Sequence, residues 1–331
     1  MKATMIALGL LVTGLPLLTA ANSATLRLPD GRSNFFAGSR ISIPVEMHAR
    51  EQGAVRLSWS LQMAGAVIAR REIALDLQQG EVATHALDLE LPQTRDGIAL
   101  KGLLRMALTG PRGEALDEIE SPLYVFDPDP FQYRQKWLKD LNLHVYDPEG
   151  ATVAIFEQAG IPFSEIMNPA AFESAKGGIL IIGENLSLRE SRGLMEAALQ
   201  ALQAKVSIVV LAPVDGEFQL PGMGTTGNAP QPAALSFYDR NIITRLDKRL
   251  DLLCWTEGRD TVSRYFQIGA HRSEPEIMVS EDQGWPWIAL DWKGGRRARL
   301  CGFAIIRDWE KSPAPRYLLA ALLEQITRQS P

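Results

Sequence analysis

The stretch that decides the fold of this 331-residue chain is GGILIIGENLSLRESRGLMEAALQALQAKVSIVVLAP, residues 177–213. Residues 179–182 and 206–211 are apolar runs without polar alternation, which is typical of strands buried on both faces. Between them, leucines and alanines over residues 186–202 recur at close to 3.6 residues and predict a helix with one apolar stripe. The stretch therefore predicts two parallel strands joined by a helix, with any ligand site beyond the carboxyl ends of the strands.

The residues on either side continue this alternation of strands and helices. A strand is predicted over residues 141–146 and a helix over 151–159. The last helix is expected to begin at Ser312, an acceptable N-cap, with Pro313 at its first position. This order predicts a doubly wound, flavodoxin-like α/β domain over residues 137–331.

Residues 25–126 have a different pattern, because short alternating runs are separated by glycine-containing turns. In VRLSWSLQM, residues 55–63, Trp59 alternates with serines and is expected to face a core. The spacing predicts an antiparallel β-sandwich with immunoglobulin-like architecture. The sequence DPDP, residues 127–130, excludes both helix and central strand, so residues 127–136 are expected to link two domains.

Composition and the first residues bear on location and partners. A net charge of −5 gives no reason to expect a nucleic acid or an anionic membrane as partner. Residues 1–24 combine Lys2, an apolar stretch and small residues, the pattern of a secretory signal peptide with cleavage after Ala21 or Ala24. We therefore expect export to the periplasm or the extracellular space, and no membrane span after cleavage.

The cysteines, the histidines and one glycine-rich stretch predict neither a metal site nor a cofactor site. Cys254 and Cys301 lie in apolar stretches, so they form either a disulfide or two buried thiols. The four histidines lack ligand spacing, and we expect no metal. Residues 222–227 match the letters of a dinucleotide fingerprint, but prolines surround them and no helix can follow, so no cofactor is expected.

Three carboxylates are the candidate catalytic groups. Asp147, Glu184 and Asp215 each follow a predicted parallel strand, so they can face a common crevice. Two of them at catalytic separation would act as acid and base on a glycosidic bond. The alternative is structural, since Asp147 begins a turn and Glu184 precedes a helix whose positive end favours a carboxylate.

Three tryptophans and the turn after the first central strand are the candidate ligand contacts. Trp285, Trp287 and Trp292 lie within eight residues, and exposed rings can stack on sugar faces. Together with Glu184 and Asn185 they would form a glycan site. The alternative is that the rings pack in the core, because large aromatic side chains are more often buried than exposed.

The α/β region resembles a known family. Residues 145–150 (VYDPEG), 178–183, 250–255 (LDLLCW), 299–302 and 312–316 are similar to the class I glutamine amidotransferase-like domain. In exported bacterial proteins that domain is appended to β-sandwich domains, notably in β-galactosidase-like members of glycoside hydrolase family 2. The resemblance covers about residues 137–329 and implies the fold and a link to polysaccharide processing.

The residues that would carry amidotransferase catalysis are missing. The family places its catalytic cysteine in a tight elbow after a central strand, and the equivalent position here reads Ala212-Pro213-Val214. We therefore expect an exported, non-catalytic accessory or binding protein whose partner is a glycan or a protein. The alternatives are a carbohydrate hydrolase that uses the strand-end carboxylates, and a structural or assembly module.

Overall fold

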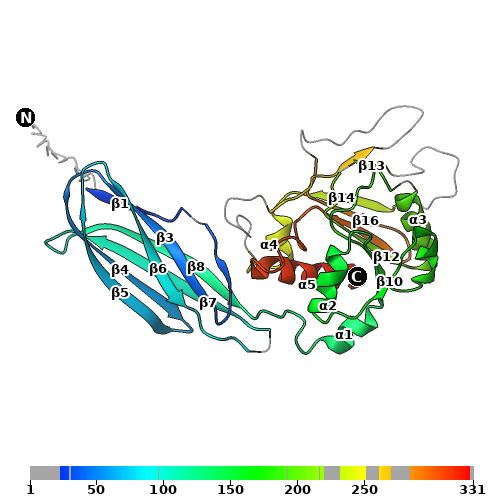
Figure 1. Ribbon diagram of the computed structural model, residues 1–331, viewed down its shortest axis with the longest axis horizontal. Helices are drawn as coiled ribbons and strands as arrows, with labels where there is room; N and C mark the ends of the chain where they lie inside the picture. Colours follow the sequence, from blue (N-terminus) through cyan, green and yellow to red (C-terminus); the bar gives the residue numbers. More distant parts are fainter. Residues whose placement is uncertain are drawn as a thin grey trace, which may run out of the picture.

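The computed structural model describes most of the chain. It covers residues 23–29, 31–95, 97–191, 193–215, 217–219, 232–250, 261–269 and 284–328. Most of the predicted signal peptide, Cys254, His271 and residues 222–227 lie outside the described residues. Figure 1 shows an elongated molecule, with strands β1–β8 at one end and a sheet flanked by helices at the other.

Strands β1–β8 form two sheets. Three strands lie in the order β1-β3-β6 and five in the order β2-β8-β7-β4-β5. Neighbours pair antiparallel, apart from the parallel pair β2 and β8. The strands cover Ala24–Arg27 (β1), Asn34–Phe36 (β2), Arg40–Ala49 (β3), Gly53–Met63 (β4), Ala66–Leu77 (β5), Val82–Glu90 (β6), Ala99–Thr109 (β7) and Ala115–Phe126 (β8).

Alternation along the strands builds one core between these two sheets. In β4 every second residue is buried, namely Val55, Leu57, Trp59, Leu61 and Met63. Both sheets contribute to the same hydrophobic cluster, as expected for sheets packed face to face. The prediction that Trp59 faces the core is confirmed.

The C-terminal sheet is mixed. Its seven strands lie in the order β10-β9-β11-β12-β17-β16-β14, and the first five run parallel. Strands β16 and β14 add to this array antiparallel. The strands cover Leu143–Tyr146 (β9), Ser164–Glu165 (β10), Ile179–Ile182 (β11), Ser207–Leu211 (β12), Ala234–Tyr238 (β14), Trp287–Asp291 (β16) and Arg297–Cys301 (β17), while Glu217–Gln219 (β13) and Gln267–Gly269 (β15) pair separately.

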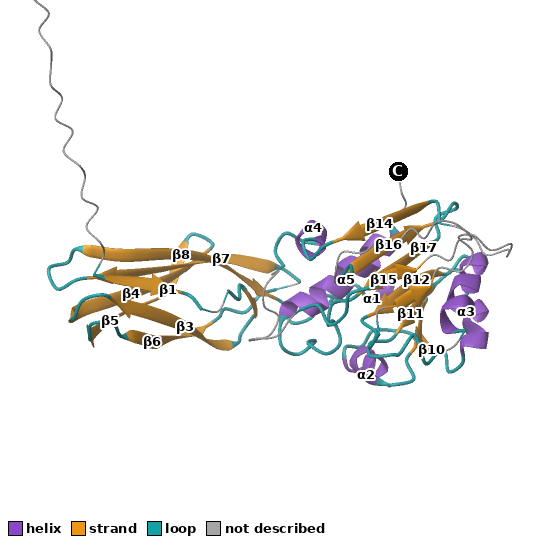
Figure 2. Cartoon of the chain, turned by 90° about the horizontal axis from the view of Figure 1, so that it is seen from above, coloured by secondary structure: helices purple, strands orange, loops and turns teal. Residues whose placement is uncertain are grey.

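Helices cover both faces of this sheet, as Figure 2 shows. Ile179 and Ile181 of β11 join a cluster with helices α2 and α5, whereas Leu180 and Ile182 join a second cluster with α3. The helices cover Gln135–Asp140 (α1), Ala151–Gln158 (α2), Leu194–Ala201 (α3), Ile242–Leu246 (α4) and Pro313–Thr327 (α5). In the part of the chain described here, no helix combines the length and the apolar character needed to cross a membrane.

Two helix predictions have different outcomes. Helix α5 begins as predicted, because the Ser312 side chain accepts a hydrogen bond from the backbone N–H of Ala314. The helix expected over residues 186–202 is wrong in its first half, since α3 begins only at Leu194. The carboxylate of Asp215 binds the N–H groups of Leu188 and Arg189 and holds that segment in a turn.

Candidate functional site

The carboxyl edge of the parallel strands holds the three predicted carboxylates, and each makes its own backbone contacts. Asp147 follows β9 and is buried. Its Oδ2 accepts hydrogen bonds from the N–H groups of Thr152, at 2.7 Å, and Val153, at 3.0 Å, and so caps helix α2. Its Oδ1 is buried without a hydrogen-bond partner among the described residues, against Gly183, where a Cβ atom would collide with it.

Glu184 follows β11 and is 0% exposed. Its carboxylate accepts hydrogen bonds from the N–H groups of Ile306, at 2.7 Å, and Arg307, at 3.1 Å. Burial raises the pKa of Glu184 to about 7, and these two N–H groups act in the opposite direction. The side chain therefore fastens the segment after β17 to the edge of the sheet.

The third carboxylate, Asp215, lies beyond β12 and binds the turn at residues 187–189. It accepts hydrogen bonds from the Ser187 hydroxyl, at 2.6 Å, and from the N–H groups of Leu188 and Arg189, at 3.1 and 3.2 Å. Asn185 is exposed with a φ of 70°, and its N–H donates to the carbonyl of Ala212. Each carboxylate is thus occupied by the backbone of a different segment.

The position equivalent to a nucleophile elbow is buried and apolar. Ala212 is buried after β12, and the Pro213 carbonyl accepts a hydrogen bond from the Arg264 side chain. The N–H of Val214 donates to the carbonyl of Leu186. These contacts close the turn without placing a hydroxyl or thiol in it.

The predicted aromatic platform is corrected by the structure. Trp287 is 0% and Trp292 4% exposed, and the two rings pack in the clusters on opposite faces of the sheet. Trp285 is half-buried, with its ring 5.5 Å from that of Phe237. Both faces of this sheet are covered, so alternating side chains of β16 enter one core or the other. The rings at 287 and 292 have no face left for a sugar.

Cys301 carries a fully buried thiol that forms no disulfide within the described residues. Burial raises the pKa of this thiol to about 12, so it stays protonated and unreactive. Cys254, with which it would pair in the disulfide alternative, lies outside the described residues. Within the described ranges, no group of three histidine, cysteine, aspartate or glutamate side chains is placed to hold a metal ion.

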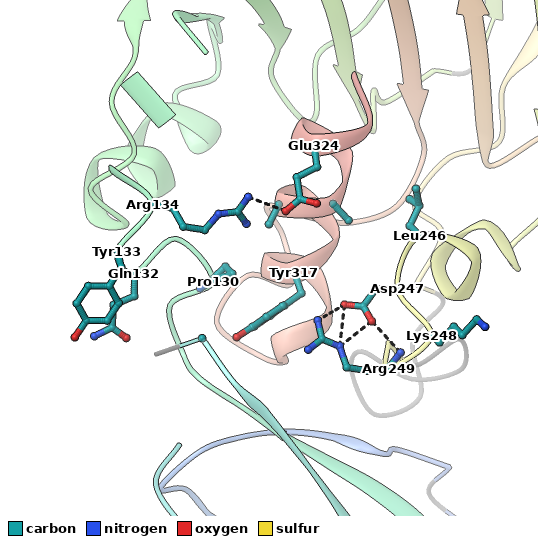
Figure 3. A pocket seen from close by; sticks show the side chains of 13 residues that line it. Pro130, Gln132, Tyr133, Arg134, Leu246, Asp247, Lys248, Arg249, Tyr317 and Glu324 are labelled. Carbon is teal, nitrogen blue, oxygen red and sulfur yellow. Dashed lines mark hydrogen bonds and ion pairs between the residues drawn. The ribbon is translucent and has the colours of Figure 1, made fainter. Parts of the chain in front are cut away.

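A cavity of about 950 Å³ lies where the two parts of the molecule meet (Figure 3). Its walls come from residues within 130–134, from the last residue of α4 and the turn after it (residues 246–249), and from Gly97 on the N-terminal side. One face of α5 completes it with Tyr317, Ala320, Ala321 and Glu324, at the three- and four-residue spacing of a helix face. The cavity contains none of the side chains predicted from sequence.

Two ion pairs lie in the cavity wall, and Figure 3 shows them on separate sides of α5. Arg134 contacts Glu324 at 2.7 Å and its guanidinium lies 4.0 Å from the ring centre of Trp137. Arg249 contacts Asp247 at 2.6 Å. Burial alone would raise the pKa of Asp247. The hydrogen bonds and the positive charge of Arg249 together outweigh burial, and the pKa of Asp247 lies below its usual value.

Two tyrosines have contrasting positions in the same cavity. Tyr317 is buried, its ring 4.7 Å from that of Phe126, and its hydroxyl donates to the carbonyl of Asp127. Tyr133 is 77% exposed and has a φ of 62°, in the left-handed region that non-glycine residues seldom adopt. The cavity thus has one wall fixed to the N-terminal sheets and an exposed aromatic ring at its rim.

Comparisons with known proteins do not assign this chain to a family. No family model and no curated protein matches the chain. The sporulation control protein Spo0M of Bacillus subtilis matches at 13% identity and a TM-score of 0.27, over 36% of this chain and 55% of that one. Beta-glucuronidase 2 of Bacteroides uniformis matches at 9% identity and a TM-score of 0.25, over 59% of this chain and 28% of that one. A glycosyl hydrolase family 2 member from Bacteroides cellulosilyticus matches at 10% identity and a TM-score of 0.26, over 59% and 38%. The matches span about half or less of these proteins, and at such TM-scores they carry no argument about fold or activity.

Proposed function

We propose that this chain is an exported, non-catalytic binding protein of two domains, associated with polysaccharide processing. The domains are an immunoglobulin-like β-sandwich over residues 25–126 and an α/β domain over residues 137–331, joined by residues 127–136. The strand order β10-β9-β11-β12-β17 supports a flavodoxin-like arrangement of the second domain. Its relation to amidotransferase-like domains, and the link to polysaccharides, rest on the sequence resemblance.

Export is supported by the signal-like pattern of residues 1–24, and the strand pairing bears on the cleavage site. Ala24 is buried and pairs with Ala49 in β1. Cleavage after Ala24 would remove this residue from the sheet, whereas cleavage after Ala21 leaves β1 whole. We therefore propose Ala21 as the last residue of the signal peptide.

One observation carries the non-catalytic proposal: the strand-end carboxylates are already occupied. Asp147, Glu184 and Asp215 each accept two or more hydrogen bonds from nearby N–H or O–H groups. A general acid or base has to reach the proton that it transfers. Glu184 has the raised pKa of an acid catalyst, but it is fully buried and its oxygens face the backbone of residues 306 and 307.

The contacts between the two parts support a binding protein with a fixed cavity. The Arg316 side chain donates to the carbonyl of Pro128 at 2.8 Å, and the Asn34 amide donates to the carbonyl of Arg249 at 2.9 Å. Arg32 donates to the carbonyl of Lys311 at 2.8 Å. Because these bonds join β2 and the linker to α5 and the 247–250 turn, the cavity walls are held in place without a ligand.

Turnover assays test the non-catalytic proposal. Purified mature protein is incubated with chromogenic glycosides and with glutamine, next to the variants Asp147→Asn, Glu184→Gln and Asp215→Asn. The exposed carboxylate of Glu149 supplies the control variant Glu149→Gln. We expect no turnover by any form. Turnover by the wild type and Glu149→Gln that is lost in one of the three strand-end variants would contradict the proposal.

A further inference from the structure

We propose that the cavity at the junction binds a neutral, polyhydroxylated ligand, a short stretch of oligosaccharide, with Tyr133 as its stacking surface. This inference rests on the proposed function, because it names the ligand class of a binding protein. Four features carry it: the size of the cavity, the pairing of its charges, the exposed tyrosine and the fixed walls.

The size of the cavity fits a ligand of this class. A volume of about 950 Å³ lies within the range of about 300 to 1,000 Å³ that small-ligand sites occupy. Ala320 and Ala321 line it from α5 and Pro130 from the linker, so apolar surface lies next to the charged side chains. A sugar ring presents the same mixture, with C–H groups on its faces and hydroxyl groups around its edge.

The charges in the wall favour a ligand without net charge. Arg134 is paired with Glu324, which also contacts Arg328 at 3.3 Å, and Arg249 is paired with Asp247, so each carboxylate of the two pairs already has a guanidinium beside it. Figure 3 shows Lys248 directed away from both pairs. Lys248 is the charged lining residue outside these two pairs, so apart from a contact with Lys248 an anionic or cationic ligand would have to separate an ion pair or face a group of its own sign.

The same pairs suit hydroxyl groups. A guanidinium carries five N–H donors and a carboxylate only acceptors, so each pair offers both kinds of group side by side. A hydroxyl both donates and accepts. Several hydroxyls on one sugar can therefore bond to the free donors of Arg134 and the free lone pairs of Glu324 while that ion pair stays intact.

The backbone at Tyr133 points to a role beyond packing. Its ring is 77% exposed although its φ is 62°. A left-handed tyrosine is disfavoured, and such conformations persist where the surroundings impose them. The turn is imposed on both sides of Tyr133: Asp129 accepts a hydrogen bond from the N–H of Phe131, and the N–H of Arg134 donates to the carbonyl of Phe131. These bonds fix the backbone of a residue in the cavity lining, and the exposed ring of Tyr133 keeps a face free to stack on a sugar.

The walls need no ordering when the ligand binds. Tyr317 and Arg249 both touch the last residue of β8, with the Arg249 guanidinium 5.6 Å from the ring centre of Phe126. Contacts of this kind hold residues 246–249, α5 and the N-terminal sheets together before a ligand arrives. A preformed site loses less conformational freedom on binding than one that has to be assembled.

Titration calorimetry of the mature chain tests the inference with three classes of probe. Neutral cello-, manno- and xylo-oligosaccharides are compared with anionic oligogalacturonates and cationic chitosan oligosaccharides. We expect a neutral oligosaccharide to bind with an affinity that ionic strength leaves unchanged, since no net charge is neutralised. Tyr133→Ala should weaken this binding by about tenfold, the loss typical of one good aromatic contact. Because that ring is exposed, the variant should keep the wild-type melting temperature.

Three further variants test whether binding depends on the cavity and on the charge of the ligand. Met167→Ala removes another exposed side chain, 80% exposed and outside the cavity wall, and should bind like the wild type. Ala321 is partly exposed on the face of α5 that lines the cavity, so Ala321→Trp fills the cavity and should abolish binding. Glu324→Gln keeps one acceptor oxygen for a hydroxyl but removes the charge beside Arg134 and Arg328, so a neutral ligand should lose about threefold in affinity, whereas an anionic ligand would gain and a cationic ligand would lose about tenfold.

The outcomes separate this inference from the proposed function. Preference for a charged probe, or binding that survives both Tyr133→Ala and Ala321→Trp, would overturn the inference. Absence of binding by every probe would also overturn it, while the lack of turnover would leave the non-catalytic proposal standing. Binding with the expected variant pattern together with cleavage of the bound oligosaccharide would sustain the inference and overturn the proposed function.

Discussion

The carboxyl edge of the C-terminal sheet and the junction cavity are both rich in charged side chains, but they satisfy them in different ways. At the sheet edge, Asp147 and Glu184 accept hydrogen bonds from backbone N–H groups and are buried. In the cavity, Arg134 and Glu324 bind each other and stay partly exposed. A carboxylate used by the backbone maintains the fold, whereas a side-chain pair open to solvent keeps donors and acceptors for a ligand. The carboxylates at the predicted site therefore have structural roles, whereas the binding that we propose lies at a site that was not predicted.

The largest expected effect is on the free energy of unfolding, and it should differ between an aromatic side chain of the sheet and one of the cavity. Trp287→Ala should lower the free energy of unfolding by about 3 to 5 kcal/mol, because it leaves a cavity between the sheet and α5. Tyr133→Ala, at the rim of the cavity, should change it by less than about 0.5 kcal/mol. Chemical denaturation of both variants checks this. A comparable loss at both positions would show that Tyr133 is also part of a core.

The pH dependence of stability tests the buried carboxylate at the sheet edge. The folded-state pKa of Glu184, about 7, lies above its ordinary value of 4.5. Its stabilising contribution is therefore complete below pH 4.5 and is lost as the pH rises through 7. Relative to Glu184→Gln, the wild type should lose about 2 to 3 kcal/mol of unfolding free energy between pH 5 and pH 8, since one pKa unit corresponds to about 1.4 kcal/mol.

Denaturation curves of the two proteins across this range supply the measurement. Since all other titrating groups are shared, the difference between the two proteins isolates Glu184. A difference that stays constant with pH would mean that the backbone N–H groups of residues 306 and 307 keep the carboxylate ionised in spite of its burial.

A smaller effect is expected at the cap of α2. Asp147→Ala removes the acceptor for the N–H groups of Thr152 and Val153 and should cost about 1 to 2 kcal/mol of stability. Glu149→Ala changes an exposed carboxylate in the same turn and should cost almost nothing. Thermal unfolding of the two variants compares them directly. Equal melting temperatures of the two variants would show that the cap formed by Asp147 does not stabilise the fold.

Local patterns were sufficient for much of the architecture. The unbroken apolar runs at β11 and β12 indicated buried parallel strands, and the alternation around Trp59 indicated a half-covered sheet. Ser312 and Pro313 marked the start of α5. Each of these signals depends on residues close in sequence, which is why they could be read without a structure. The late start of α3 could not, because the bond that prevents helix at residues 188 and 189 comes from Asp215.

The candidate site depends on contacts between distant residues, and this limited its prediction. Strand ends were a reasonable place to look, but sequence alone does not reveal that residues 306 and 307 occupy Glu184. The cavity joins residues near 97, 130, 247 and 320, which no motif connects. One signal was available: Gln132, Tyr133 and Arg134 carry polar groups within the linker predicted over residues 127–136, and a domain boundary favours a ligand site.

Hydrogen exchange measured by mass spectrometry, with and without a saturating neutral oligosaccharide, tests the central claim most directly, because it reports on both regions in one experiment. We expect slower exchange on binding at residues 130–134, 246–249 and 317–324, and unchanged exchange at residues 184–188 and 212–215. Protection confined to residues 184–188 and 212–215 would contradict it, since the ligand would then occupy the carboxyl edge of the sheet instead of the junction cavity.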